Sequence, residues 1–240
     1  DYVIEKAAKA IDKHSITAKP RRRKNKDSKN YQTFRKKKEF NNQLDKCYLL
    51  LGKAYFYKKK YTMANNTFRF IQRQYAEDEA LMTEVSIWLF RSLTEMGRYE
   101  EAARIMDRLD GSTLKRKQRE MVAAARTDFY VRQGMYEQAI PEAERLVRTC
   151  KSIKRKPRYN FLLSQLYVKE NQDGAAKLAL KKATRFNFNY EMVFNARIGM
   201  ASAYQEGDAA VEKKLKKMLR DSRNEEFQDR IYYCLLYTSP

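Results

Sequence analysis

The chain has 240 residues, which is enough for one or two ordinary domains or for one short helical solenoid. Only seven glycines and four prolines occur, and the residues that dominate favour helix over sheet. The formal net charge of +21 predicts attraction to polyanions, acidic proteins and anionic membranes. The mean hydropathy is −0.82 and no long apolar run is present, so the sequence predicts no membrane-spanning helix.

Residues 1–16 are predicted to be an N-terminal helix, because apolar residues recur there at helical spacing. These residues are Ile4, Ala7, Ala8 and Ile11. Residues 17–38 differ sharply, since they contain eleven basic residues against the single acid Asp27. This composition predicts a loosely ordered basic linker.

The basic linker has three interpretations. A solvated, highly charged loop is favoured, contact with an acidic partner or an anionic membrane surface comes second, and nucleic acid is the least favoured because no recognition motif accompanies the charges. The contacting residues would be Arg21, Arg22, Arg23, Lys24, Arg35, Lys36, Lys37 and Lys38.

Residues 39–233 show a repeated helix–turn–helix pattern. Its landmark is a small residue early in each second helix, because two helices approach closely only where no large side chain separates them. The landmarks are Ala64, Ala102, Ala139, Ala176 and Val211. They are spaced 38, 37, 37 and 35 residues apart, against about 34 for an ideal tetratricopeptide repeat. The pattern predicts an all-α, tetratricopeptide-like helical-repeat solenoid of about five helix pairs with a truncated sixth repeat.

Two further positions follow the same frame. Twelve residues before each landmark, the predicted crossing position of the first helix is occupied by Gly52, Phe90, Thr127, Ser164 and Gly199. Seven residues after each landmark, an apolar residue is expected to enter the core, and these are Ile71, Leu109, Leu146, Ala183 and Met218. Repeat 1 matches the tetratricopeptide pattern best, from Tyr48 to Phe68.

No enzyme chemistry is expected. His14 is the one histidine, and nothing near it supplies further metal ligands or a nucleophile. No glycine-rich phosphate loop is present, so neither a metal nor another cofactor is predicted. The three cysteines, Cys47, Cys150 and Cys234, are interpreted as idle thiols, although the sequence leaves a Cys47–Cys150 bridge open.

The predicted binding surface is the concave face, which the first helices of stacked repeats line. Counting along the repeat frame places these residues there: Lys53, Tyr57, Arg91, Asp128, Arg132, Arg158, Gln165 and Lys169. Their basic and polar character would suit an extended peptide with acidic groups or a free carboxylate. A solvated helix face without a ligand carries equal weight.

Several stretches resemble one family more specifically. The entry Ala10-Ile11-x-x-His14-Ser15-Ile16 followed by Lys19-Pro20, together with Leu51-Gly52-Lys53-Ala54, Ile87-Trp88-Leu89 and Phe194-Asn195-Ala196-Arg197-Ile198, is similar to the PorW/SprE proteins. These are tetratricopeptide lipoproteins of the type IX secretion and gliding apparatus in the Bacteroidota. The resemblance implies a non-catalytic scaffold at the periplasmic face of the outer membrane, with secretion-apparatus components as partners.

Residues 234–240 depart from that family and resemble translated adapter sequence, so a non-native tail is expected there. Two other functions stay open. One is a generic cytosolic repeat adaptor, and the other is a basic repeat protein that binds RNA.

Overall fold

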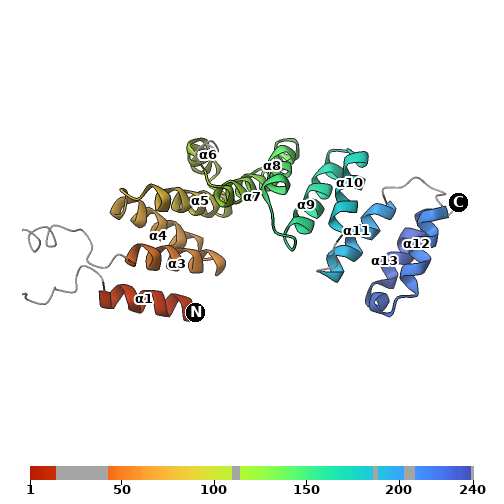
Figure 1. Cartoon of the computed structure of the whole chain (residues 1–240), viewed down its shortest axis with the longest axis horizontal. Helices are drawn as coiled ribbons and strands as arrows, with labels where there is room; N and C mark the ends of the chain where they lie inside the picture. The colour runs from red at the N-terminus through yellow and green to blue at the C-terminus, as the bar shows by residue number, and fades with distance from the viewer. Residues whose placement is uncertain (15–42, 110–113, 186–188, 203–208, 239–240) are drawn as a thin grey trace, which may run out of the picture. The chain divides into compact units, whose positions relative to one another are not determined.

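Every element in the described part of the chain is helical (Figure 1). The computed structural model describes residues 1–14, 43–109, 114–185, 189–202 and 209–238. The elements are α1 (Tyr2–His14), α3 (Leu44–Tyr57), α4 (Tyr61–Gln74), α5 (Glu79–Glu95), α6 (Tyr99–Arg108), α7 (Arg116–Arg132), α8 (Tyr136–Thr149), α9 (Lys156–Lys169), α10 (Asp173–Ala183), α11 (Tyr190–Ser202), α12 (Ala209–Leu219), the 3-10 helix η1 (Ser222–Phe227) and α13 (Gln228–Thr238). The prediction of an all-α, tetratricopeptide-like helical-repeat fold is confirmed. The predicted basic linker, residues 17–38, lies outside the described residues.

The turn within a helix pair repeats along the backbone. One residue of each of the first four turns has a left-handed φ between 55° and 72°, and these are Lys59, Gly97, Gly134 and Asn171. The next N–H donates to the carbonyl oxygen five residues before it at 2.8–2.9 Å, from Lys60 to Tyr55, Arg98 to Leu93, Met135 to Tyr130 and Gln172 to Tyr167. This 6→1 bond is the Schellman cap, which satisfies the last carbonyls of the first helix and reverses the chain.

The predicted landmark residues lie where the helices of each pair meet. All five landmarks are at most 3% exposed, and the five apolar residues seven positions later are at most 8% exposed. Gly52 shows why the position is small: a Cβ there would lie 2.5 Å from Cε1 of Phe68, which is itself fully buried. The repeat frame read from the sequence is therefore confirmed as the packing frame.

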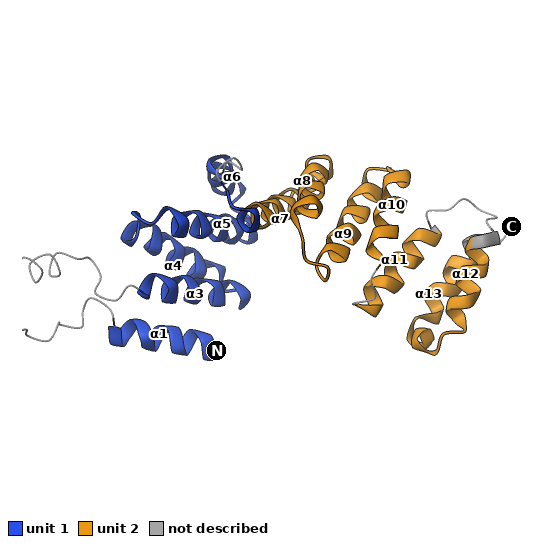
Figure 2. Cartoon of the chain, in the orientation of Figure 1, with its two compact units in different colours: residues 1–118 blue, residues 119–240 orange. Residues whose placement is uncertain are grey.

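The chain divides into two compact units, residues 1–118 and residues 119–240 (Figure 2). In the first unit α1 packs on α3, and α3, α4 and α5 each contact the next helix along the chain. Its fully buried side chains include Phe68, Ile71, Val85, Phe90 and Leu93. The repeat period predicts one solenoid over residues 39–233, and no feature of that period marks a division at residue 118.

The second unit contains two principal apolar clusters. The first joins Ala139 and Ala143 of α8 to Leu163 and Leu166 of α9 and Ala176 of α10. The second joins α11, α12 and α13, and it contains Phe194, Ile198, Leu215, Met218, Ile231 and Cys234. Because Cys234 is buried and α13 extends to Thr238, the helix continues through the start of the segment expected to be a non-native tail, and that expectation stays a prediction.

Candidate binding surface

Three of the predicted site residues come together on the first unit. Lys53 and Tyr57 lie on one stripe of α3, at positions i and i+4, and Arg91 lies on α5. Leu50 belongs to the same stripe of α3 and is 51% exposed, while Tyr57 is 70% exposed. We call the surface made by Leu50, Lys53 and Tyr57 of α3 with Glu84, Trp88 and Arg91 of α5 the α3–α5 face.

Aromatic rings hold the cations of the α3–α5 face in place. The Arg91 guanidinium lies 4.3 Å from the ring centroid of Trp88 and 4.7 Å from that of Phe56. Both rings are buried, at 4% and 7% exposure. A cation over a ring face is attracted by the ring quadrupole, so Arg91 keeps one orientation while its edge stays open to water.

The charges of the α3–α5 face are only partly neutralised. Lys53 Nζ lies 2.6 Å from Glu84 Oε1, so this pair is locally neutral. Arg91 has no carboxylate at ion-pair distance among the described residues, although its side chain is only partly buried. The edge of the Tyr57 ring meets Trp88 at 5.7 Å between centroids, which places an exposed aromatic side chain on the same indole as Arg91.

The other predicted residues lie on the second unit. On α7, Arg132 Nε donates to Asp128 Oδ2 at 3.1 Å, so these two side chains pair with each other. On α9, Arg158, Gln165 and Lys169 are exposed and share one stripe at positions i, i+7 and i+11. A single binding groove that would include both the predicted residues of the first unit and those of the second unit stays a prediction.

Sequence reasoning missed two carboxylates that determine which cations are paired. Glu84 lies seven residues before Arg91, so helical spacing alone would have placed it on the α3–α5 face. Glu120 is 3% exposed, and its Oε1 atom forms an ion pair with Nη1 of Arg155 at 2.9 Å. It lies seven residues before the crossing position Thr127, and that spacing is the signal that could have predicted its burial.

A second carboxylate contact, which is partly buried, joins α8 to α9. Tyr167 OH donates to Glu144 at 2.6 Å. Burial, reinforced by this hydrogen bond to a carboxylate, raises the pKa of Tyr167 to about 12. The contact is structural, because the phenol is 9% exposed and lies against the apolar cluster of α8, α9 and α10.

Three features of the described residues bear on metal binding, membrane insertion and thiol chemistry. No three His, Cys, Asp or Glu side chains gather there into a group that could hold a metal ion. None of the described helices is both long enough and apolar enough to cross a membrane. The three cysteines are free thiols, and burial raises the pKa of Cys150.

A family model for the tetratricopeptide repeat matches residues 157–190. The chain folds as tetratricopeptide-like helical repeats. The match covers α9 from its second residue, all of α10 and the first residue of α11, so it contains one whole helix pair. No curated protein matches the chain. Repeats of this kind are typically non-catalytic and mediate protein–protein interactions through their helix faces.

Proposed function

We propose that the protein is a non-catalytic scaffold that binds a partner protein through the α3–α5 face. The observation that carries the proposal is the arrangement of Tyr57 and Arg91 around Trp88. Tyr57 is 70% exposed, and Arg91 is held by two rings without a carboxylate partner among the described residues. Tyr, Trp and Arg are the residue types that dominate binding energy at protein interfaces.

The arrangement of Arg91 lowers the cost of binding. A guanidinium already fixed over Phe56 and Trp88 loses little side-chain freedom when a partner arrives, and each immobilised long side chain otherwise costs about 0.5–1.5 kcal/mol. A partner carboxylate can then accept two parallel hydrogen bonds from the fork of Arg91. Such an exposed contact contributes about 0.2–1 kcal/mol, so burial of Tyr57 and Leu50 has to supply most of the affinity.

The finer proposal concerns the cellular role. We infer a component of the type IX secretion or gliding machinery, a lipoprotein at the periplasmic face of the outer membrane with secretion-apparatus partners. Its support is the residue likeness to the PorW/SprE proteins. The basic linker would add contact with an anionic membrane surface. The competing role is a cytosolic adaptor, and the upstream coding sequence separates the two, because a signal peptide ending in a lipoprotein cysteine excludes the cytosolic role.

RNA binding is the second candidate function. The observation in its favour is the net charge of +21. Phosphate contacts make such binding fall steeply with salt, by orders of magnitude between low and physiological ionic strength. A partner bound mainly through Tyr57 and Leu50 would instead change its affinity little over the same range of salt.

Site-specific photo-crosslinking tests the α3–α5 face directly. A benzophenone amino acid replaces Tyr57, and a matched probe replaces Asn66, which is also exposed but lies on α4. We expect a discrete protein adduct at position 57, absent at position 66 and lost when Arg91→Glu is added. Trp88 fluorescence checks that the variant keeps its packing, because Trp88 is the sole tryptophan. Equal adducts at both positions, or adducts that survive Arg91→Glu in the folded variant, would exclude the face.

A further inference from the structure

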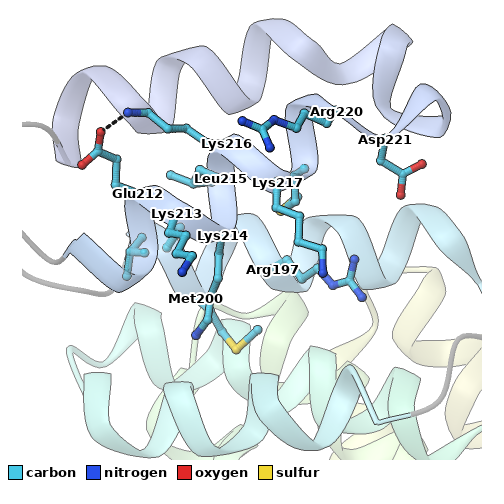
Figure 3. Close-up of a pocket in the computed structure, with 13 residues that line it drawn as sticks. Arg197, Met200, Glu212, Lys213, Lys214, Leu215, Lys216, Lys217, Arg220 and Asp221 are labelled. Atoms are coloured by element: carbon cyan, nitrogen blue, oxygen red, sulfur yellow. Dashed lines mark ion pairs between the residues drawn. The ribbon is translucent and has the colours of Figure 1, made fainter.

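The second unit contains a basic hollow that the proposed function does not use. It has a volume of about 1000 Å³ and lies between α11 and α12 (Figure 3). Its apolar lining is Met200 and Ala201 of α11 with Val211, Leu215 and Met218 of α12. The volume is at the upper end of the range of about 300–1000 Å³ for ligand pockets, which is enough for several side chains. We call it the α11–α12 groove.

The carboxylates of the α11–α12 groove are already paired. Glu212 lies 2.5 Å from Lys216, as the dashed line in Figure 3 marks. Asp221 accepts from Nε and Nη2 of Arg223 at 2.9 and 2.7 Å, and this pairing lowers the pKa of Asp221. Neither acid is therefore available to neutralise the other cations that line the hollow.

Three lysines of the groove have no carboxylate partner in the described part of the chain. Lys213, Lys214 and Lys217 are exposed, and none lies at ion-pair distance from a carboxylate among the residues with described positions. Figure 3 shows them reaching from α12 toward Met200 and Arg197 of α11. Arg197 acts on Asp221 electrostatically, but Asp221 is already held by Arg223.

This arrangement carries a cost that an acidic ligand would remove. Lys213 and Lys217 are four residues apart on one helix, and Lys214 and Lys217 are three apart, so both pairs face each other. Like charges at this spacing destabilise a helix. Lys216 and Lys217 suit the C-terminal end of α12, but Lys213 and Lys214 lie too far from that end to benefit from the helix dipole.

We propose that the α11–α12 groove binds an acidic amphipathic segment of a partner protein. Its carboxylates would meet Lys213, Lys214 and Lys217, and its apolar side chains would cover the lining around Met200. Methionine adapts to varied apolar side chains, which suits a surface that receives a helix or an extended peptide. The proposal is independent of the α3–α5 face, because the groove lies wholly within the second unit.

Two other polyanions fit the groove less well. Among the described residues that line it there is no aromatic side chain, whereas single-stranded nucleic acid is bound by stacking its bases on such rings. A membrane surface cannot enter a hollow to reach a recessed apolar lining, and amphipathic elements that bind membranes instead insert an exposed apolar face. Charge together with an enclosed apolar lining therefore favours a peptide.

The test uses the whole chain and a labelled model peptide. The probe is a fluorescein-labelled helical peptide of about four turns, with glutamates along one face and leucines along the other. Its control is a scrambled peptide of the same composition, which keeps the charge and loses the apolar face. Fluorescence anisotropy gives the dissociation constants. We expect the amphipathic peptide to bind at least about tenfold more tightly than the scrambled one, a gap that one buried leucine suffices to produce.

Variants then assign the site. Lys213→Glu with Lys217→Glu should weaken the amphipathic peptide by about tenfold or more, because two attractions become repulsions. The matched control is Lys181→Glu with Lys182→Glu, which makes the same charge change at exposed positions of α10 and should change affinity by less than about threefold. If the double glutamate variant does not fold, the variant with Lys213→Gln and Lys217→Gln replaces it. This variant should show a smaller loss of peptide affinity, because it removes two charges without reversing them. Far-UV circular dichroism monitors folding.

Three results would overturn the proposal. One is equal binding of the amphipathic and scrambled peptides, and another is equal loss in the α12 and α10 variants. The third is preference for another polyanion: phosphatidylserine vesicles or oligo-uridine that bind in a Lys213- and Lys217-dependent way while the peptide does not. Loss of binding restricted to the α12 variant, together with the tenfold preference, supports it. An intact α3–α5 crosslink in that variant shows that the two surfaces act separately.

Discussion

Replacing Gly52 by alanine should destabilise the first unit, against the usual effect of this substitution in a helix. Gly52 is buried in the middle of α3. A Cβ there would lie 2.5 Å from Cε1 and 2.9 Å from Cδ1 and Cζ of Phe68, closer than real Cβ atoms approach other atoms. Phe68 is fully buried and stacks on Trp88 at 6.3 Å between centroids, so its ring has little room to retreat.

The sign of the effect follows from two opposed magnitudes. Alanine is favoured over glycine in a helix interior by about 1 kcal/mol. Forcing an extra methyl group into a packed core costs about 1–3 kcal/mol, and a contact of this closeness with a buried ring belongs at the upper end. The net loss of unfolding free energy should therefore be about 1–2 kcal/mol.

Two other glycines serve as controls for the Gly52→Ala prediction. At Gly199 the nearest atom to a Cβ is Leu180 Cδ1 at 3.6 Å, an ordinary contact, and at Gly174 nothing lies within 4 Å. Neither has a left-handed backbone. Alanine at either position should raise the unfolding free energy, by about 0.5–1 kcal/mol at Gly199 and by less at Gly174 in the first turn of α10.

Urea unfolding measures the series. Trp88 fluorescence reports the Gly52 site locally, whereas circular dichroism follows the helices of both units and so also covers the second unit, where Gly199 and Gly174 lie. A loss of about 1–2 kcal/mol lowers the urea midpoint by roughly 0.5–1 M for a typical slope. Phe68→Leu should reduce the cost of Gly52→Ala, because the smaller side chain leaves room for the methyl group. A Gly52→Ala protein as stable as the parent, beside a destabilised Gly199→Ala protein, would refute the reasoning.

Three more predictions concern the turns and the buried polar pairs. Lys59 has a φ of 59°, so Lys59→Gly should raise the unfolding free energy by about 1 kcal/mol, and an unchanged thermal midpoint would contradict this. The folded protein keeps the Tyr167 proton up to a pKa of about 12, whereas the unfolded chain releases it near the ordinary value of 10. Stability from this group is thus complete below pH 10 and is lost between pH 10 and 12, and Tyr167→Phe should flatten that decline in alkaline denaturation. Glu120→Gln removes the charge facing Arg155, which is 56% exposed, so calorimetry should show a loss of only about 1 kcal/mol or less; a loss several times larger would mean that the pair is effectively buried.

The packing frame could be predicted from the sequence because it depends on side-chain size alone. A close helix crossing needs a small residue, so Ala64, Ala102, Ala139 and Ala176 recur at the period of the fold and are fully buried. The turns were less predictable. Two of the four left-handed positions are glycines, but Lys59 occupies another at a cost of about 1 kcal/mol, which packing of the flanking helices can offset.

Side-chain pairing in the candidate site could not be predicted in the same way. The repeat frame places Lys53 on the binding face but does not reveal its partner, Glu84, which lies 31 residues away on α5. Whether such a pair forms depends on the rotation and height of one helix relative to its neighbour, and the repeat spacing fixes neither to within a side-chain length. The position of Arg91 over Phe56 and Trp88 depends on the same relative placement.

The net charge of +21 indicates a polyanion partner but does not locate its site, because basic side chains are spread along the chain and some of them have acids beside them. Arg69 pairs with Glu101 between α4 and α6, and Arg148 pairs with Glu144 along α8. Selectivity for an acidic ligand must come from cations that no carboxylate neutralises, since a paired cation offers a partner little net attraction. Arg91 on one unit and Lys213, Lys214 and Lys217 of α12 on the other meet this condition among the described residues, and each lies beside apolar side chains. An acidic protein segment with its own apolar residues satisfies both requirements at either surface, whereas a purely anionic polymer satisfies only the first.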